Sequence, residues 1–135
     1  MKYLFDIGHP AHVHYFRNAI RILESRGHQV AITTRDKEIS LYLLERYGFR
    51  YSCTGKNLGS ALGKAFSIFR NDAAILKVAR RFRPDLFVSF FSPFAAQVGK
   101  IMGRPVLGFT DTENANLSIS LSKPFTDVIV IPSCY

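Results

Sequence analysis

The sequence has few cysteines and no long hydrophobic run. Its 135 residues contain two cysteines, Cys53 and Cys134, which lack metal-binding spacing and favour a reducing compartment over a structural disulfide. No apolar run approaches the ~18 residues that a membrane-spanning helix needs. At the N-terminus, Asp6, His9 and His12 interrupt any apolar core of a signal peptide. These absences argue against a secreted or membrane-spanning protein and point to the cytoplasm.

Acidic residues are also scarce. Ten acidic residues against 18 Lys and Arg give a formal net charge of +8. Most of the excess lies between Lys56 and Arg83, where seven basic residues stand against one acid, Asp72. Such a basic surface suits anionic partners, for example nucleotide phosphates, acidic lipids or nucleic acid. The 47% hydrophobic and 21% charged content is ordinary for one globular domain of this size.

The first 35 residues have the pattern of a strand, a loop, a helix and a second strand. Residues 3–7 form an apolar run typical of a buried parallel strand, and Gly8-His9-Pro10 interrupts it. The helix that follows carries apolar residues at helical spacing, namely Val13, Phe16, Ile20 and Leu23. Gly27 is the expected C-terminal stop, and residues 29–34 supply the second strand.

The rest of the chain continues this alternation. Strands are predicted at 49–53, 86–90, 105–109 and 127–131, and helices at 37–47, 58–82, 93–102 and after Asp111. Asn71-Asp72 is typical of a break with a new N-cap, so we expect two helices within 58–82. The pattern predicts an α/β fold with a doubly wound parallel sheet of about six strands and helices on both faces.

Three histidines, His9, His12 and His14, follow the first strand. A zinc site is one interpretation, but two residues of separation on a helix give ~200° of rotation, so His12 and His14 would point to opposite sides. We expect no metal. Capping and packing are the simpler roles for these side chains. Because open α/β sheets bind ligands beyond the carboxyl ends of their strands, an imidazole there could also serve as a base or donor.

The sequence lacks a dinucleotide fingerprint. Gly8 stands without the other glycines of G-x-G-x-x-G, so tight pyrophosphate binding by this loop is not expected. Gly55, Gly59 and Gly63 recur at four-residue spacing without the G-K-[ST] ending of a phosphate loop. Those three glycines fit a helix start or close packing better than a phosphate site.

Polar residues follow other predicted strands at the same edge of the sheet. Ser92 follows the fourth strand, while Asp111, Glu113 and Asn114 follow the fifth. N-capping of the next helices is one role for Ser92 and Asp111; binding substrate hydroxyls or acid/base chemistry is the other. Asp6 lies inside an apolar strand, and a buried carboxylate needs a partner, so we expect it to support the loop at His9.

The basic segment between Leu58 and Arg83 has two interpretations. One is an ordinary solvated helix face. The other is an interfacial helix on which Phe66 and Phe69, flanked by Lys64 and Arg70, make peripheral contact with an acidic membrane. No basic-aromatic motif supports nucleic-acid binding, so a nucleic-acid partner is not predicted.

A family resemblance adds to this picture. Gly8-His9-Pro10-Ala11-His12, with a helix ending in Arg26-Gly27-His28-Gln29-Val30, resembles the opening of GT-B glycosyltransferases. Pro84-Asp85-Leu86, Gly103-Arg104-Pro105-Val106 and Asp111-Thr112-Glu113-Asn114 resemble the later part of that domain, notably in the lipid-linked N-acetylglucosaminyltransferase of peptidoglycan synthesis. Over essentially its whole length, the chain most resembles a domain-of-unknown-function family related to GT-B transferases and UDP-N-acetylglucosamine 2-epimerases.

The resemblance implies a two-domain enzyme whose site lies in the cleft. Residues 1–135 would be the N-terminal domain, and the C-terminal nucleotide-sugar-binding domain would be absent, so the fragment alone is expected to be inactive. His9, His12, His14, Asp111, Glu113 and Asn114 would then face the cleft. The double-glycine loop of the transferase is replaced here by Gly8-His9-Pro10, so the resemblance does not identify the acceptor substrate.

The expected activity is glycosyl transfer from a nucleotide-activated sugar to a small-molecule acceptor, without metal or other cofactor. His12 or His14 would act as the base, and Gly8, His9, Ser92, Asp111, Glu113 and Asn114 would bind substrate. Alternatives are a UDP-sugar epimerase or hydrolase, and a non-catalytic binding or membrane-docking module. The expected location is the cytoplasm, with peripheral contact at the inner membrane face through the basic segment.

Overall fold

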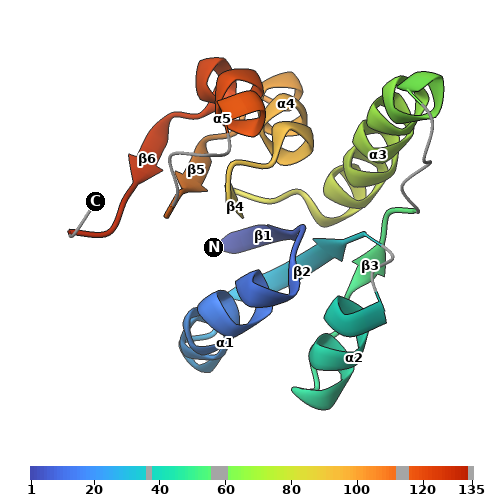
Figure 1. The fold of residues 1–135 in the computed structure, drawn as a ribbon. Coiled ribbons are helices and arrows are strands. Elements are labelled where there is room, and N and C mark those ends of the chain that lie inside the picture. Colours follow the sequence, from blue (N-terminus) through green and yellow to red (C-terminus); the bar gives the residue numbers. More distant parts are fainter. Residues whose placement is uncertain (36–37, 56–60, 112–115, 134–135) are drawn as a thin grey trace.

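The computed structural model describes residues 1–35, 38–55, 61–111 and 116–133. Within these residues six strands form one sheet in the order β3-β2-β1-β4-β5-β6, and every neighbouring pair is parallel (Figure 1). The strands are β1 Lys2–Ile7, β2 Gln29–Thr34, β3 Ser52–Cys53, β4 Leu86–Ser89, β5 Val106–Phe109 and β6 Val128–Val130. This confirms the predicted doubly wound parallel sheet.

Helices cover both faces of the sheet. Helices α1 (Pro10–Ser25) and α2 (Glu38–Arg46) lie on one face, while α3 (Ala61–Phe82), α4 (Pro93–Ile101) and α5 (Asn116–Ser122) lie on the other (Figure 1). A 3-10 turn, Lys123–Phe125, joins α5 to β6. Among the described helices, none is both long and apolar enough to cross a bilayer. Cys53 is a free, exposed thiol, and Cys134 lies outside the described residues.

Two apolar clusters, one on each face, hold the helices to the sheet. Towards α1 and α2, the cluster includes Phe5, Ile7, Val13, Phe16 and Ile20. Towards α3 and α4, it includes Leu4, Ile75, Ala79, Phe87 and Val98. The alternation of Leu4 and Phe5 between the two faces follows from the two-residue period of a strand, so β1 is buried on both sides as a central strand should be.

The prediction of two helices within 58–82 is wrong, because α3 runs unbroken from Ala61 to Phe82. Asn71 is 1% exposed and lies one and two turns before Ile75 and Ala79, which face the core. Continuous burial of this face outweighs the local preference of Asn and Asp for a cap. Strand β3 also differs, since it begins at Ser52 rather than at residue 49, and Phe49 packs into the core beside Leu44.

Candidate functional site

A cavity of about 420 Å³ opens at the carboxyl edge of the sheet. Its wall includes Gly8 and His12 at the start of α1, Arg35 directly after β2, Ser92 at the start of α4, and Leu117 on α5. The residues come from separate βα units, yet they meet because the carboxyl ends of parallel strands share one edge. That edge is where open α/β sheets bind ligands.

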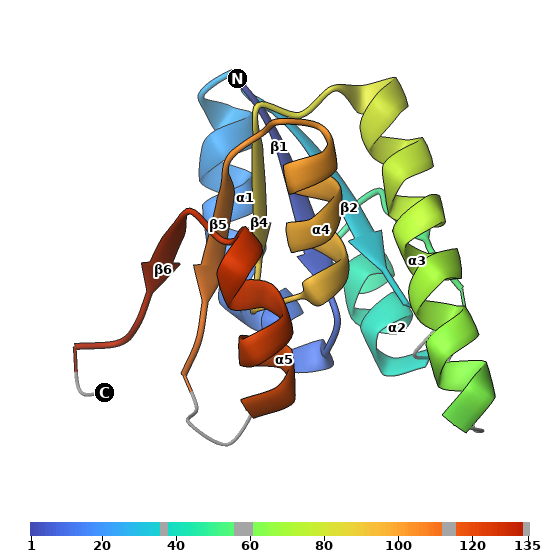
Figure 2. The same ribbon diagram turned by 90° about the horizontal axis from the view of Figure 1, so that it is seen from above.

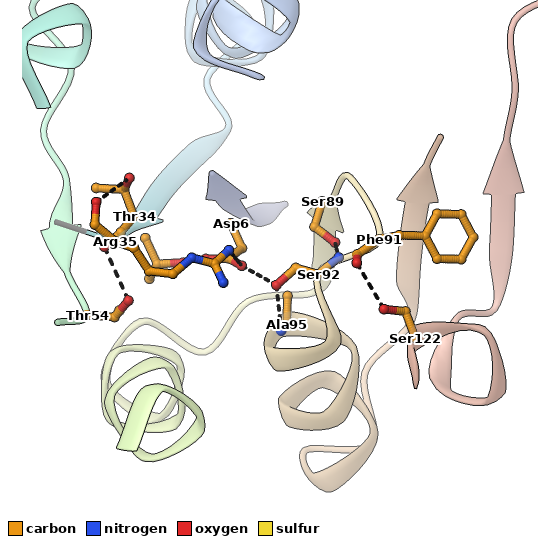
Figure 3. A network of polar contacts seen from close by, with 10 residues as sticks. Asp6, Thr34, Arg35, Thr54, Ser89, Phe91, Ser92, Ala95 and Ser122 are labelled. Atoms are coloured by element: carbon orange, nitrogen blue, oxygen red, sulfur yellow. Dashed lines mark hydrogen bonds and ion pairs between the residues drawn. The ribbon is translucent and has the colours of Figure 1, made fainter. Parts of the chain in front are cut away.

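Asp6, at the end of β1, is the centre of the polar network beside this cavity (Figure 3). Its side chain is 1% exposed. Thr33 donates its hydroxyl proton to Asp6 Oδ1 at 2.8 Å, and Ser92 donates to Asp6 Oδ2. Arg35 Nη2 lies 3.6 Å from the same Oδ2. The buried carboxylate therefore has the partners that its place in an apolar strand requires. Thr33 lies in β2, Arg35 directly follows β2, and Ser92 lies at the start of α4.

Ser92 links this network to α4. While its hydroxyl donates to Asp6, its Oγ accepts the backbone N–H of Ala95 at 3.4 Å as the N-cap of the helix. The preceding residue, Phe91, has a φ of 42°, a left-handed conformation that is unusual for a bulky side chain. Its carbonyl accepts a hydrogen bond of 3.0 Å from Ser122 Oγ, so α5 holds this turn in place (Figure 3). The predicted capping role of Ser92 is confirmed, and the same side chain lines the cavity.

Arg35 is a site residue that the sequence analysis missed. Its guanidinium lies over the ring of Phe94 at 4.6 Å from the centroid, and its side chain is 14% exposed. A Cβ added at Gly8 would meet Arg35 Nη2, so the absence of a side chain at position 8 leaves room for the guanidinium. The available signal was position: Arg35 is the first residue after a central strand, at the same edge as His9.

His12 lines the cavity with its ring stacked on Phe90, at a centroid distance of 4.4 Å and an interplanar angle of 10°. Its Nδ1 is buried and has no hydrogen-bond partner among the described residues. Burial and the nearby His9 lower the pKa of His12 from 6.5 to about 4, although the charges of Asp111 and Asp6 act in the opposite direction. The imidazole is therefore neutral at pH 7.

The other two histidines have different surroundings. His9 is exposed and caps α1, because its Nδ1 accepts the N–H of Ala11 at 3.2 Å, and its ring centroid lies 5.8 Å from that of His12. His14 is exposed and its Nδ1 lies 3.2 Å from the hydroxyl of Tyr47, just beyond α2. The structure thus brings His9 and His12 together and places His14 elsewhere, as the ~200° rotation between positions 12 and 14 implies.

The predicted residues after β5 are only partly described. Asp111 is exposed, and its charge acts on the pKa of His12. Glu113 and Asn114 lie outside the described residues. Among the residues that the structure describes, no three His, Cys, Asp or Glu side chains gather as a metal site would require.

Solved structures share this fold. The chain is similar to MurG from Acinetobacter baumannii, with a TM-score of 0.78, 14% identity, and coverage of 97% of this chain and 41% of that one. It is also similar to a UDP-GlcNAc 2-epimerase from Neisseria meningitidis bound to UDP-GlcNAc, with a TM-score of 0.74, 16% identity, and coverage of 98% of this chain and 40% of that one. For SsfS6, a glycosyltransferase from Streptomyces sp. SF2575, the TM-score is 0.69 and the identity 16%, with coverage of 93% of this chain and 44% of that one.

These similarities establish the fold and leave the activity open, since all three identities are 16% or lower. The fold is that of the N-terminal domain of GT-B glycosyltransferases and UDP-GlcNAc 2-epimerases. The chain spans less than half the length of these solved structures. No curated protein matches the sequence. A family model matches residues 1–135, and the chain belongs to the family described as "Protein of unknown function (DUF354)".

Proposed function

We propose that this chain is the N-terminal half of a GT-B-type glycosyltransferase that acts on a nucleotide-activated sugar in the cytoplasm. Its cavity would contribute the acceptor-side contacts. The observation that carries the proposal is the His12 imidazole on the wall of a cavity at the carboxyl edge, which Arg35 and Ser92 of the Asp6 network also line. Relatives by fold are bound to UDP-GlcNAc and to dTDP, which supports nucleotide-sugar partners.

His12 is the residue to which we assign the base. A neutral imidazole can accept the proton of an acceptor hydroxyl as that oxygen forms its bond to the anomeric carbon and the nucleotide diphosphate leaves. Its pKa of about 4 makes it a weak base. An anionic substrate beside the ring would raise that pKa towards neutrality, because nearby negative charge favours the imidazolium. His14, which lies beside Tyr47, is not part of this assignment.

Arg35 would orient the substrate. A guanidinium has five N–H donors, and the ion pair with Asp6 is formed through a single nitrogen, Nη2. Its position on the cavity wall suits contacts to sugar hydroxyls or phosphate oxygens. Asp6 and the ring of Phe94 fix the guanidinium from two sides, so the group is preorganised. Gly8, His9 and Asp111 complete the proposed substrate-binding set, together with Glu113 and Asn114 outside the described residues.

The test uses a two-domain protein that contains this chain together with a nucleotide-sugar-binding domain. Changing His12 to Ala should reduce the rate of nucleotide release from UDP- or dTDP-sugars by about 10²-fold or more, the usual contribution of a general base. His14→Ala is the matched control and should retain activity close to that of the unchanged protein. Equal loss in both variants, or no loss in either, would contradict the assignment to His12.

A UDP-sugar epimerase or hydrolase is the second candidate. The observation that favours it is the similarity to the Neisseria meningitidis 2-epimerase, whose TM-score of 0.74 is close to that of MurG at 0.78. In that case carboxylates would carry the chemistry, and Asp111 is the exposed carboxylate whose charge acts on His12. Release of UDP and an altered sugar in the absence of any acceptor would identify this activity, whereas a transferase would need the acceptor.

A further inference from the structure

The N-terminal half of α3 carries an exposed apolar stripe. Leu62, Phe66 and Phe69 are 87%, 64% and 75% exposed. They recur at positions i, i+4 and i+7, so they share one face of the helix. The opposite face, with Asn71, Ile75 and Ala79, is buried against the sheet. Large apolar side chains gathered on one exposed face are typical of a contact site.

The C-terminal half of α3 continues the same face with cations. At 100° per residue, Lys77 lies about 20°, Arg80 about 40° and Arg81 about 60° from the direction of Phe66. All three are exposed. The acid of this helix, Asp72, is half-buried and points about 120° away from Phe66. Arg70 is also exposed and lies about 40° from Phe66, with its guanidinium beside Gly55. The described outer face therefore combines three large apolar side chains with four cations and no acid; the side chain of Lys64 lies outside the described part.

We propose that this outer face of α3, defined by Leu62, Phe66, Phe69, Arg70, Lys77, Arg80 and Arg81, binds the surface of an acidic lipid bilayer. Helices that lie in a membrane interface combine apolar side chains with Lys and Arg, and anionic lipids attract the cations. The net charge of +8 adds long-range attraction to the same surface. Docking would leave the fold unchanged, because the buried face of α3 already packs on the sheet.

The position of α3 makes this face accessible. Figure 1 shows α3 at the outer end of its layer, with α4 on one side only. Figure 2 shows that the N-terminal end of α3 lies at the same end of the molecule as the N-terminal end of α5. The apolar half of the face is thus at the carboxyl edge, where the cavity opens. A docked protein would hold that edge close to the bilayer.

Lipid is favoured over the other partners. Nucleic acid would engage the cations but would leave Leu62, Phe66 and Phe69 in water, and the segment has no basic-aromatic motif. A second copy of the chain could cover the apolar side chains, but two proteins of charge +8 repel each other. An acidic bilayer satisfies both halves of the face at once.

Co-sedimentation of the 135-residue protein with vesicles tests the proposal. Vesicles of 30% phosphatidylglycerol and 70% phosphatidylcholine should bind the protein at low salt, and pure phosphatidylcholine vesicles should bind it at least about tenfold more weakly. Changing Phe66 and Phe69 together to Ser should weaken binding to the acidic vesicles by at least about tenfold. Ile39 and Tyr42 on α2, which are 65% and 60% exposed, provide the matched control when changed to Ser.

The control pair should bind within about twofold of the unchanged protein, and circular dichroism should show both variants folded. Equal binding by the Phe66/Phe69 variant, equal binding to neutral vesicles, or no binding to acidic vesicles would each overturn the proposal. So would a dimer, seen by sedimentation velocity, that is lost in the Phe66/Phe69 variant. None of these readouts depends on turnover, so failure here leaves the proposed enzymatic function untouched.

Discussion

Ser92 serves two neighbours at once, because one hydroxyl donates to the buried Asp6 carboxylate and accepts the N–H of Ala95. A side chain with only a donor or only an acceptor could not do both. The arrangement ties the start of α4 to the end of β1, so Ser92 Oγ supports the cavity wall together with the bond from Ser122 to the Phe91 carbonyl.

Replacing Ser92 with Ala is therefore expected to lower the free energy of unfolding by about 1–3 kcal/mol, from the lost helix cap and a less satisfied buried carboxylate. Urea denaturation measures this change. Ser25→Ala, at the exposed end of α1, is the matched control and should change stability by less than about 0.5 kcal/mol. Equal effects of the two substitutions would show that the bond between Ser92 and Asp6 contributes nothing.

The low pKa of His12 predicts a pH-dependent loss of stability. In the unfolded chain the imidazole takes up its proton near pH 6.5, whereas in the folded chain burial and His9 delay this to about pH 4. Protonation thus favours the unfolded chain, and the penalty grows as the pH falls from 6.5 to 4. His12→Gln should remove this part of the pH dependence, and urea midpoints at pH 7.5 and 4.5 measure it. Identical pH profiles of the two proteins would contradict the assignment.

The half-buried Asp72 predicts a pH dependence of stability with the opposite sign. Burial, and secondly the charge of Asp6, raise the pKa of Asp72 from 3.8 to about 6. The folded chain therefore holds this proton more tightly than the unfolded chain, and stability falls as the pH rises from 4 to 6. Asp72→Asn should be more stable than the unchanged protein at pH 8 and lose that advantage below pH 4. Glu24→Gln, on the exposed side of α1, should show no such gain.

At the scale of elements, the sequence predicted strands and helices where local and tertiary preferences agree. The first βαβ unit, from Lys2 to Thr34, was predicted nearly to the residue because its period changes cleanly from strand to helix and back. Prediction failed at Asn71, where a local capping preference competes with burial in the core. Strand β3 is shorter than predicted because the side chain of Phe49 packs into the core and residue 49 is not part of the sheet.

The buried Asn71 offers a test of this competition. Both polar atoms of its side chain are buried without a hydrogen-bond partner among the described residues. Asn71→Leu fills similar space without polar groups, so it should raise the free energy of unfolding by about 1–2 kcal/mol. Asn18→Leu, on the exposed face of α1, should stay within about 0.5 kcal/mol. A destabilised Asn71→Leu protein would indicate that the amide has a structural partner.

At the scale of the whole molecule, the edge of the sheet that holds the cavity was predictable from topology alone. Placing Gly8, His12 and Ser92 there required only parallel strands and their order. The part that was not predictable depends on side-chain conformation: Arg35 folds back over Gly8 onto Asp6, and Phe90 stacks on His12. Such contacts join residues far apart in the chain, and no period or motif encodes them.

The isolated 135 residues should not turn over nucleotide sugars, because under the proposed function a second domain supplies most of the donor contacts. We expect binding of UDP-sugars weaker than about 1 mM, measured by isothermal titration calorimetry, and no release of UDP. Turnover by these residues alone would contradict the two-domain proposal.

The guanidinium that fills the space over Gly8 couples the side chains that positions 8 and 35 can hold. A methyl group at position 8 would displace the flexible guanidinium of Arg35. The loss of stability in a Gly8→Ala protein would therefore come from the broken contact between Arg35 and Asp6, and not from backbone strain. Where residue 35 is short, Ala at position 8 costs nothing further, and a thermodynamic cycle over both sites should be strongly non-additive. Among homologous sequences the two positions should therefore covary, with larger residues at 8 accompanying smaller ones at 35.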